Sequence, residues 1–256
     1  MIAIDIGGTF VRYKVNQTTF KVLTKEIELI SFLEALIIKY KPIKIAISFA
    51  GQVNDNKILS SPNTNFINID LKKIEKKYNI TIILENDLNC AVIAESCYFD
   101  EKNIVALYSG TGLGAGIIDN AKLIRGYTNL AGEIGHIPYK NTPFKCKCGK
   151  NNCLELFCSG SGIDKWSEFY KKDGLNDNII KNLYIEALYN AIGIIVVLFN
   201  PKILVLGGGV IQNNKKLFNF SKLDKFIANF DKVDIKFTNL ENASLKGAEI
   251  LLKDKK

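Results

Sequence analysis

A histidine and a group of cysteines are the residues with the most recognisable chemistry in the chain. The single histidine lies ten residues upstream of a C-x-C-x₄-C cluster, and together these residues are His136, Cys146, Cys148 and Cys153. Three thiolates and one imidazole form a closed tetrahedral zinc site of the structural type, so this spacing predicts one structural Zn²⁺. Cys158 is a rival fourth ligand; otherwise it is interpreted, like Cys90 and Cys97, as a small buried apolar residue.

Carboxylates flank this cluster and also follow a predicted strand. Glu133 and Glu155 lie on either side of the cysteines, so a bound metal would bring them toward one another. Further upstream, Glu85-Asn86-Asp87 stands where a predicted strand meets a helix. Asp87 is either a general base at a sheet edge, where open α/β folds bind ligands, or simply a helix-capping or first-turn acid. Asn86 offers both a donor and an acceptor to hydroxyl groups.

Three glycine-rich turns follow predicted strands. In the first, Asp5-Ile6-Gly7-Gly8-Thr9, the glycines would let backbone N–H groups approach an anion, and Thr9 adds a hydroxyl donor. Asp5 would hold Mg²⁺ through water. The alternative is a plain hairpin turn without a ligand. Gly110-Thr111-Gly112-Leu113-Gly114 returns into a strand. It is therefore not a dinucleotide fingerprint, which must open a helix. Gly207-Gly208-Gly209 is a weaker third site, where a nucleoside would approach the backbone.

Alternating strands and helices must position these residues. Strands are expected at 2–6, 11–15, 19–24, 43–49 and 81–84, with helices at 29–40, 71–78 and 87–98. The strand-glycine-strand opening recurs at 105–118, followed by helices at 161–171 and 178–200 and strands at 203–206 and 233–237. This recurrence indicates a duplicated α/β fold with a mostly parallel sheet.

Two domains with a cleft between them are therefore expected. The first covers residues 1–106, and a C-terminal helix at 244–256 is a candidate to complete it. The second covers residues 107–243 and carries the Cys-rich insertion at 137–158. A length of 256 residues fits two modest domains.

Composition excludes several classes of protein. Hydrophobic residues make up 47% of the chain and charged residues 23%, which is typical of a globular protein and excludes disorder. The net charge is +8, but Arg12 and Arg125 are the only arginines and the lysines are scattered, so no nucleic-acid partner is expected. The N-terminus shows no signal sequence, and the most apolar run, 192–199, is too short to span a membrane. A cytoplasmic protein without a membrane partner is expected.

Taken together, the motifs resemble the ROK family of sugar kinases, which share the actin-like (ribonuclease H-like) ATPase fold. The matching strings occur in the family's order over nearly the whole chain: Asp5-Ile-Gly-Gly-Thr9, Glu85-Asn-Asp87, Gly110-Thr-Gly-Leu-Gly114, Ala131-Gly-Glu-Ile-Gly-His136, Cys146-x-Cys-Gly-x₃-Cys153-Leu-Glu155 and Leu206-Gly-Gly-Gly-Val210. The resemblance implies transfer of the γ-phosphate of ATP to the 6-hydroxyl of a hexose, with Mg²⁺ bound to ATP, and a homodimer.

The resemblance also implies a role for each motif residue. Asp87 matches the catalytic base. The positions that contact the sugar are Asn63, Asn86, Asp87, Glu133, His136 and Glu155. The positions that contact phosphate are Asp5, Gly7, Gly8, Thr9, Gly110, Thr111, Gly112 and Gly114. Gly207, Gly208 and Gly209 lie on the adenosine side.

The chain departs from the family's pattern at two positions. Phe10 replaces a residue that is often Lys or Asn, with Arg12 keeping a charge nearby, and Ala50-Gly51 replaces the usual Pro-Gly. Glucose is the expected substrate, with N-acetylglucosamine or N-acetylmannosamine as alternatives. A non-catalytic sugar-sensing regulator is a further alternative; such relatives carry a helix-turn-helix ahead of the first glycine turn, whereas only four residues precede Asp5 here. A catalytically dead sugar-binding module is disfavoured because Asp87 and both phosphate turns are present.

Overall fold

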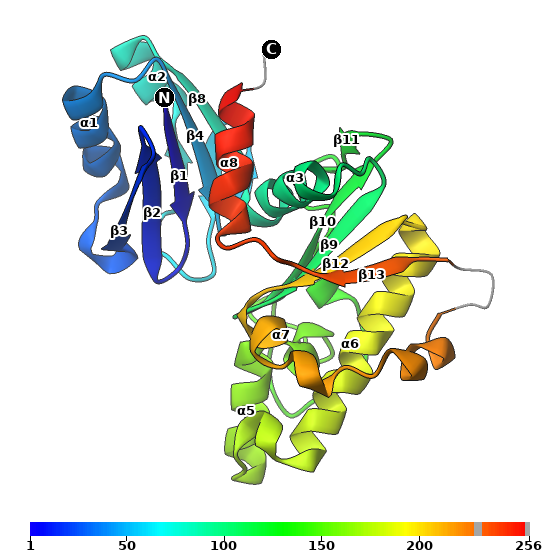
Figure 1. The fold of residues 1–256 in the computed structure, drawn as a ribbon. Helices are drawn as coiled ribbons and strands as arrows, with labels where there is room; N and C mark the ends of the chain where they lie inside the picture. Colours follow the sequence, from blue (N-terminus) through cyan, green and yellow to red (C-terminus); the bar gives the residue numbers. More distant parts are fainter. Residues whose placement is uncertain (228–231, 254–256) are drawn as a thin grey trace. The chain divides into compact units, whose positions relative to one another are not determined.

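The computed structural model describes residues 1–227 and 232–253 and divides the chain into two compact units (Figure 1). Unit 1 comprises Met1–Cys97, Arg125–Ala131 and Leu240–Lys256, and unit 2 comprises Tyr98–Ile124 and Gly132–Asn239. The predicted boundary at residue 106 differs from this partition because residues 104–106 form part of a strand in the sheet of unit 2. The last three residues of the predicted helix 244–256 lie outside the described residues.

Unit 1 is built on a mixed five-stranded sheet. Its order is β3 (Thr18–Leu23), β2 (Phe10–Val15), β1 (Ile2–Ile6), β4 (Lys44–Phe49) and β8 (Thr81–Asn86). β1, β4 and β8 run parallel, whereas β1, β2 and β3 pair antiparallel. A small second sheet, which the sequence pattern did not predict, joins β5 (Gln52–Asn54), β6 (Lys57–Ser60) and β7 (Ile69–Asp70).

Side chains alternate between the two faces of the unit 1 sheet. Ile2, Ile4 and Ile6 face a core that includes α1 (Leu29–Tyr40) and α2 (Lys72–Tyr78). The opposite face, which includes Ala3, is covered by α3 (Asp87–Phe99) and α8 (Ala243–Lys253). The C-terminal helix therefore returns to complete the unit that the first strand begins.

Unit 2 repeats the sheet of unit 1. Its order is β11 (Lys122–Leu123), β10 (Leu113–Asp119), β9 (Ile104–Ser109), β12 (Ile203–Gly207) and β13 (Asp234–Phe237). As in unit 1, the first three strands pair antiparallel and the last three pair parallel. The duplicated pattern is thus present, but each sheet is mixed rather than mostly parallel.

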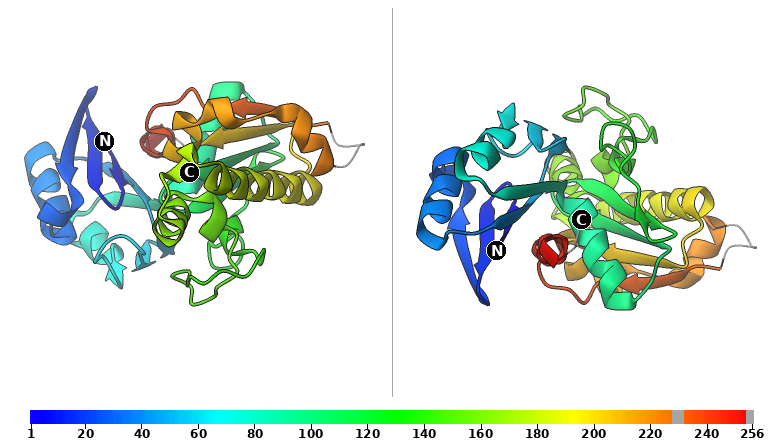
Figure 2. Two further views of the ribbon diagram at one scale, coloured as in Figure 1. Left: turned by 90° about the horizontal axis from the view of Figure 1, so that it is seen from below. Right: turned by 90° about the horizontal axis from the view of Figure 1, so that it is seen from above.

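The core of unit 2 is organised around α6 (Asn178–Phe199), which lies against the strands in both views of Figure 2. Tyr184, Leu188, Ile192 and Ile195 on this helix are fully buried. Its length and composition would suffice to cross a membrane, but half of its apolar window is buried inside the unit, as in the core helix of a globular domain. Three shorter helices complete the unit: α4 (Glu155–Cys158), α5 (Gly160–Tyr170) and α7 (Gly209–Asn213).

Candidate active site

In unit 1, polar residues meet at the carboxyl ends of three parallel strands. Asp5 on β1 pairs in register with Ser48 on β4, and Ser48 pairs with Glu85 on β8, so their side chains emerge on one face. Ser48 Oγ donates to Asp5 Oδ1 at 2.9 Å, and Arg12 Nη1 lies 3.7 Å from Asp5 Oδ2. Burial raises the pKa of Asp5, while the Ser48 hydrogen bond and the Arg12 charge oppose that rise. Burial is the larger effect, so the pKa of Asp5 stays raised, and the two contacts offset only part of the cost of ionising this carboxylate.

The first glycine turn lies immediately beyond Asp5. Gly7 N donates to Phe10 O at 3.0 Å and closes the turn, and Thr24 Oγ1 donates to Gly7 O at 2.7 Å. A Cβ on Gly8 would lie 2.6 Å from the Cβ of Asn63, so only glycine allows these two segments to approach each other. The structure therefore places Asn63 beside the turn that holds Gly7, Gly8 and Thr9. Gly8 and Thr9 are exposed, as an anion site requires.

The junction between β8 and α3 resolves which residue caps the helix. Asn86 Oδ1 accepts from Leu88 N at 2.9 Å and from Asn89 N at 3.3 Å, which is the hydrogen bonding of an N-cap. Asn86 Nδ2 donates to Gly51 O at 3.2 Å. Asp87 is the first residue of α3, so its carboxylate belongs to the first turn and is not the cap. The side chain of Asn86, predicted to contact sugar, is largely engaged in capping.

In unit 2, the second glycine turn lies against the start of α5. Gly160 N donates to Gly110 O at 2.7 Å, and Ser161 N donates to Thr111 O at 3.2 Å. Thr111 and Gly112 are exposed. A Cβ on Gly112 would lie 3.3 Å from Glu155 Oε2. The predicted phosphate turn and one predicted sugar residue are therefore neighbours within this unit.

Gly114 was assigned to the same turn, but it lies inside a strand. It belongs to β10 and pairs with Tyr108 of β9, and it is buried. The turn exposed to a ligand is thus limited to Gly110, Thr111 and Gly112.

The predicted zinc ligands converge in unit 2. One donor atom from each of the four residues lies within 4.8 Å of all the others: His136, Cys146, Cys148 and Cys153. Cys148 Sγ lies 3.3 Å from Cys153 Sγ, and Cys146 Sγ lies 3.5 Å from His136 Nδ1. Donor atoms of a tetrahedral zinc site are separated by about 3.3–3.8 Å, so these two separations match Zn²⁺ and the four residues are a candidate set of ligands for it.

Cys158 is not part of this cluster. Its thiol is fully buried and donates to Leu154 O at 3.3 Å, and burial raises its pKa well above the usual value for cysteine. Cys90 is likewise fully buried, whereas Cys97 is exposed, contrary to its interpretation as a buried residue.

The two flanking carboxylates each contact a member of the donor set. Glu133 Oε2 lies 3.8 Å from His136 Nε2, the ring nitrogen opposite the one that faces Cys146. Cys146 Sγ donates to Glu155 Oε1 at 2.9 Å. Partial desolvation raises the pKa of Glu133, the charge of His136 opposes the rise, and Glu155 adds to it. Glu133, His136 and Glu155 thus present two carboxylates and one ring nitrogen around a single cluster.

The third glycine run has a packing explanation for two of its members. A Cβ on Gly207 would lie 2.6 Å from the ring of Tyr108, and a Cβ on Gly208, whose φ is +86°, would lie 2.3 Å from Ser109 O. Gly209 has open space where its Cβ would be. Close packing therefore explains why Gly207 and Gly208 are glycine, but it does not explain Gly209.

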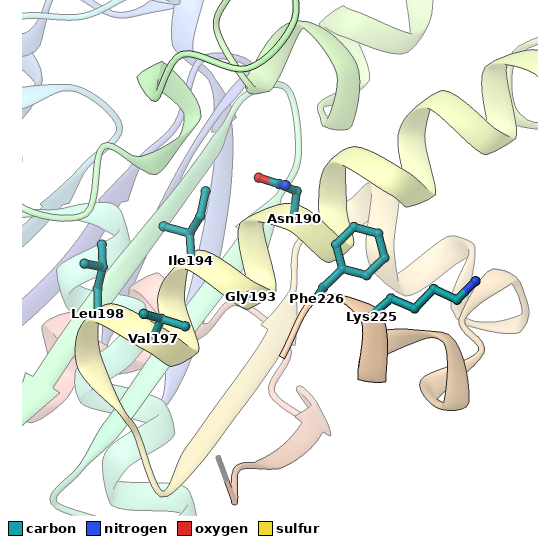
Figure 3. A pocket seen from close by; sticks show the side chains of 7 residues that line it. All are labelled: Asn190, Gly193, Ile194, Val197, Leu198, Lys225 and Phe226. Atoms are coloured by element: carbon teal, nitrogen blue, oxygen red, sulfur yellow. The ribbon is translucent and has the colours of Figure 1, made fainter. Parts of the chain in front are cut away.

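An apolar pocket of about 440 Å³ lies elsewhere in unit 2 (Figure 3). It is bounded by Asn190, Gly193, Ile194, Val197 and Leu198 of α6 and by Lys225 and Phe226. None of its lining residues belongs to the predicted site. The polar constellations described above, not this pocket, offer groups suited to chemistry.

The sequence analysis missed a buried charge cluster in unit 1. Glu85 is 4% exposed, and its Oε2 lies 2.7 Å from Arg125 Nε. Asn89 and Asn129 also donate to Glu85. Arg125 is one of only two arginines in the chain, a signal that could have marked it as a residue with a specific partner.

Comparisons with known proteins place these features in a family. A model described as the ROK family matches residues 1–255. The xylose repressor of Bacillus subtilis is 30% identical over 243 residues, covering 85% of this chain and 63% of the repressor, so the chain spans less than two thirds of that relative. A glucokinase of Streptomyces coelicolor is 30% identical over 185 residues, covering 65% of this chain and 58% of that enzyme. A ROK hexokinase structure from Thermus thermophilus shares the fold, with a TM-score of 0.84 over 99% of both chains at 21% identity.

Proposed function

Because the chain belongs to the ROK family, whose sugar kinases have the actin-like ATPase fold, we propose that it is an ATP-dependent hexose kinase acting on glucose. One observation carries the proposal. In unit 1, the parallel strands β1 and β8 end in Asp5 and in the Asn86-capped start of α3, which presents Asp87. Carboxylates at the carboxyl edge of a parallel sheet suit the binding and activation of a ligand.

Asp87 is assigned the role of general base. It accepts the proton of the hexose 6-hydroxyl as that oxygen attacks the γ-phosphorus of ATP. A new O–P bond forms, the bond from phosphorus to the bridging oxygen of ADP breaks, and hexose 6-phosphate, ADP and a proton result. General-base assistance contributes roughly 10²–10⁴-fold, so positioning and charge neutralisation must supply the rest.

Unit 2 is assigned the recognition of the sugar hydroxyls. Glu133 and Glu155 are acceptors, and His136 offers Nε2 while Nδ1 faces the cysteines. A Zn²⁺ held by His136, Cys146, Cys148 and Cys153 would fix the orientation of the imidazole ring. Asn63 and Asn86 of unit 1 are assigned as additional hydroxyl contacts.

The exposed glycine turns are assigned to the phosphates of ATP. Backbone N–H groups at Gly8 and Thr9 in unit 1, and at Thr111 and Gly112 in unit 2, can donate to phosphate oxygens. Gly209 is assigned to the nucleoside. Mg²⁺, when bound with ATP, neutralises phosphate charge, and Asp5 is the carboxylate that would hold it through water.

Two other functions have relatives that support them; for an N-acetylhexosamine kinase, the relative is an N-acetyl-D-glucosamine kinase of Pasteurella multocida that is 29% identical over 170 residues. An N-acetylhexosamine kinase would use the same Glu133, His136 and Glu155, with additional room beside C2 of the sugar. A sugar-sensing regulator is supported by the 30% identity to the xylose repressor. A regulator needs hexose binding but no turnover, so an activity measurement separates it from both kinases.

The decisive experiment measures ATP consumption with glucose, mannose, fructose, N-acetylglucosamine and N-acetylmannosamine. We expect glucose to give the highest kcat/KM; an N-acetyl sugar better by about tenfold would overturn glucose as the substrate. Asp87→Asn should lower kcat at least about 100-fold while the glucose Kd stays within about threefold. Asp164→Asn, an exposed carboxylate on α5, is the matched control. An Asp87→Asn variant that keeps more than about a tenth of kcat would refute the base assignment.

A homodimer is also proposed, on the family resemblance. Light scattering at micromolar concentration should give twice the mass of one chain, and a monomer would contradict it.

A further inference from the structure

A short loop, Arg125–Ala131, belongs to unit 1 although its neighbours on both sides in the sequence belong to unit 2. The chain leaves unit 2 after Ile124 and re-enters it at Gly132, one residue before Glu133. The loop is a closed turn: Ala131 N donates to Arg125 O at 3.0 Å, and Gly126 and Asn129 adopt positive φ values of 71° and 60°. A closed turn of this kind needs a specific attachment to the unit in which it packs.

Glu85 is the residue that provides this attachment. Its Oε2 lies 2.7 Å from Arg125 Nε, at the first residue of the loop. Its Oε1 accepts from Asn129 Nδ2 at 3.2 Å, from Asn89 Nδ2 at 2.9 Å and from Asn86 N at 2.9 Å. A carboxylate that is 4% exposed must be compensated in this way, because an unpaired buried charge is costly.

Asn129 reinforces the same attachment. Its Nδ2 donates to Val53 O at 3.0 Å, and its Oδ1 accepts from Asn89 Nδ2 at 3.1 Å. The side chains of Arg125 and Asn129, four residues apart, therefore attach the loop to the rest of unit 1, and both of them contact Glu85. Arg125 itself is half-exposed, so the ion pair is solvated on one side only.

We propose, building on the kinase function above, that Glu85 is a positioning residue whose ion pair with Arg125 holds the 125–131 loop and thereby sets the affinity for the hexose. Glu85 lies two residues before Asp87, and the loop ends two residues before Glu133. One carboxylate therefore holds the backbone next to both groups that are assigned to the sugar. Fixing these segments before the sugar binds reduces the entropy lost on binding. Both oxygens of Glu85 are engaged with the protein, so it does not itself contact the substrate.

The test replaces Arg125, because its half-exposed side chain can be changed without leaving a hole in the core. In Arg125→Met, we expect the KM for glucose to rise at least about tenfold while kcat and the KM for MgATP stay within about threefold. Arg125→Lys keeps the charge without the guanidinium geometry and should recover part of the affinity. The matched control is Lys57→Met, which removes an exposed lysine that pairs with Asp70 at 3.6 Å in the same unit.

Hydrogen exchange supplies a measurement that does not depend on catalysis. The amides of residues 125–131, including that of Ala131, should exchange at least about tenfold faster in Arg125→Met than in the wild type or in Lys57→Met. Unchanged exchange in this loop, or a KM change shared with Lys57→Met, would overturn the proposal. A wild-type protein that phosphorylates no hexose would contradict the kinase assignment instead, and the exchange data would still decide whether the ion pair holds the loop.

Discussion

Two glycines with the same backbone φ allow the packing role of one of them to be measured. Gly132 and Gly149 both have a φ of +91°, a conformation that costs other residues about 1–2 kcal/mol. They differ in surroundings: a Cβ on Gly132 would lie 1.9 Å from Ala115 O, whereas a Cβ on Gly149 meets nothing within 4 Å. Alanine at either position would have to adopt the same positive φ, but only Gly132→Ala adds a collision.

The collision sets the expected magnitude. Carbon and carbonyl oxygen atoms normally stay about 3.3 Å apart or more, so the backbone at Gly132 must move by more than about 1 Å. Overpacking of this kind costs about 1–3 kcal/mol. The movement also disturbs the hydrogen bond from Ala115 N to Gly132 O, which is 2.9 Å long. We therefore expect Gly149→Ala to lose about 1–2 kcal/mol of unfolding free energy and Gly132→Ala about 2–5 kcal/mol.

Urea unfolding followed by tryptophan fluorescence measures both variants. Trp166 is the only tryptophan, is 6% exposed, and lies in unit 2 together with both glycines, with its Nε1 donating to Leu156 O at 3.0 Å. Metal content is matched between the variants, because Gly149 lies among the predicted zinc ligands in the sequence. A difference between the two variants below about 0.5 kcal/mol would refute the reasoning, since it would show that the collision relaxes at no cost.

Two further predictions concern pH and metal. The ion pair with Lys202 at 2.7 Å, followed by backbone N–H donors, lowers the pKa of Glu101 to about 2. Because this pKa is depressed in the folded state, the ionised Glu101 stabilises the fold above the usual pKa of glutamate, and this stabilisation is lost as the pH falls toward 2. The difference in Tm between the wild type and Glu101→Gln should therefore be largest near neutral pH and smaller at about pH 3. A difference in Tm that does not change with pH would contradict this prediction. For the metal, elemental analysis should find one zinc per chain, retained in Cys97→Ser and lost from Cys148→Ser; zinc that survives the loss of Cys148 would place it elsewhere.

Local patterns in the sequence predicted most of the elements and the four clustered residues that could hold a metal. The helices at 29–40 and 178–200 and the strands around the glycine turns follow from hydrophobic periodicity, which is a property of neighbouring residues. The cysteine spacing predicted the donor set because a tight knuckle brings close neighbours together. The small sheet of β5, β6 and β7 was missed because its strands have two to four residues, too few to show a period.

Contacts between distant segments were beyond the reach of such patterns. The row formed by Asp5, Ser48 and Glu85 depends on the register of three strands separated by about 40 residues each, and a shift of one residue would turn a side chain to the opposite face. Likewise, nothing local to Gly207 or Gly208 shows that they pack on β9, so the sequence could not reveal this second reason for glycine at these positions.

The residue that caps α3 affects how the proposed role of Asp87 is interpreted. From the sequence, Asp87 was equally a helix cap and a general base, because Asn and Asp are both good N-caps. The structure gives the capping hydrogen bonds to Asn86, and it surrounds Glu85 with four donors. Of three consecutive polar residues, two thus take part in holding the backbone, Asn86 as the cap and Glu85 as the anchor of the 125–131 loop. The division accounts for the sequence Glu-Asn-Asp at this junction: Asn86 caps the helix that carries Asp87, Glu85 anchors the loop, and a fixed carboxylate is what the proposed proton abstraction by Asp87 would require.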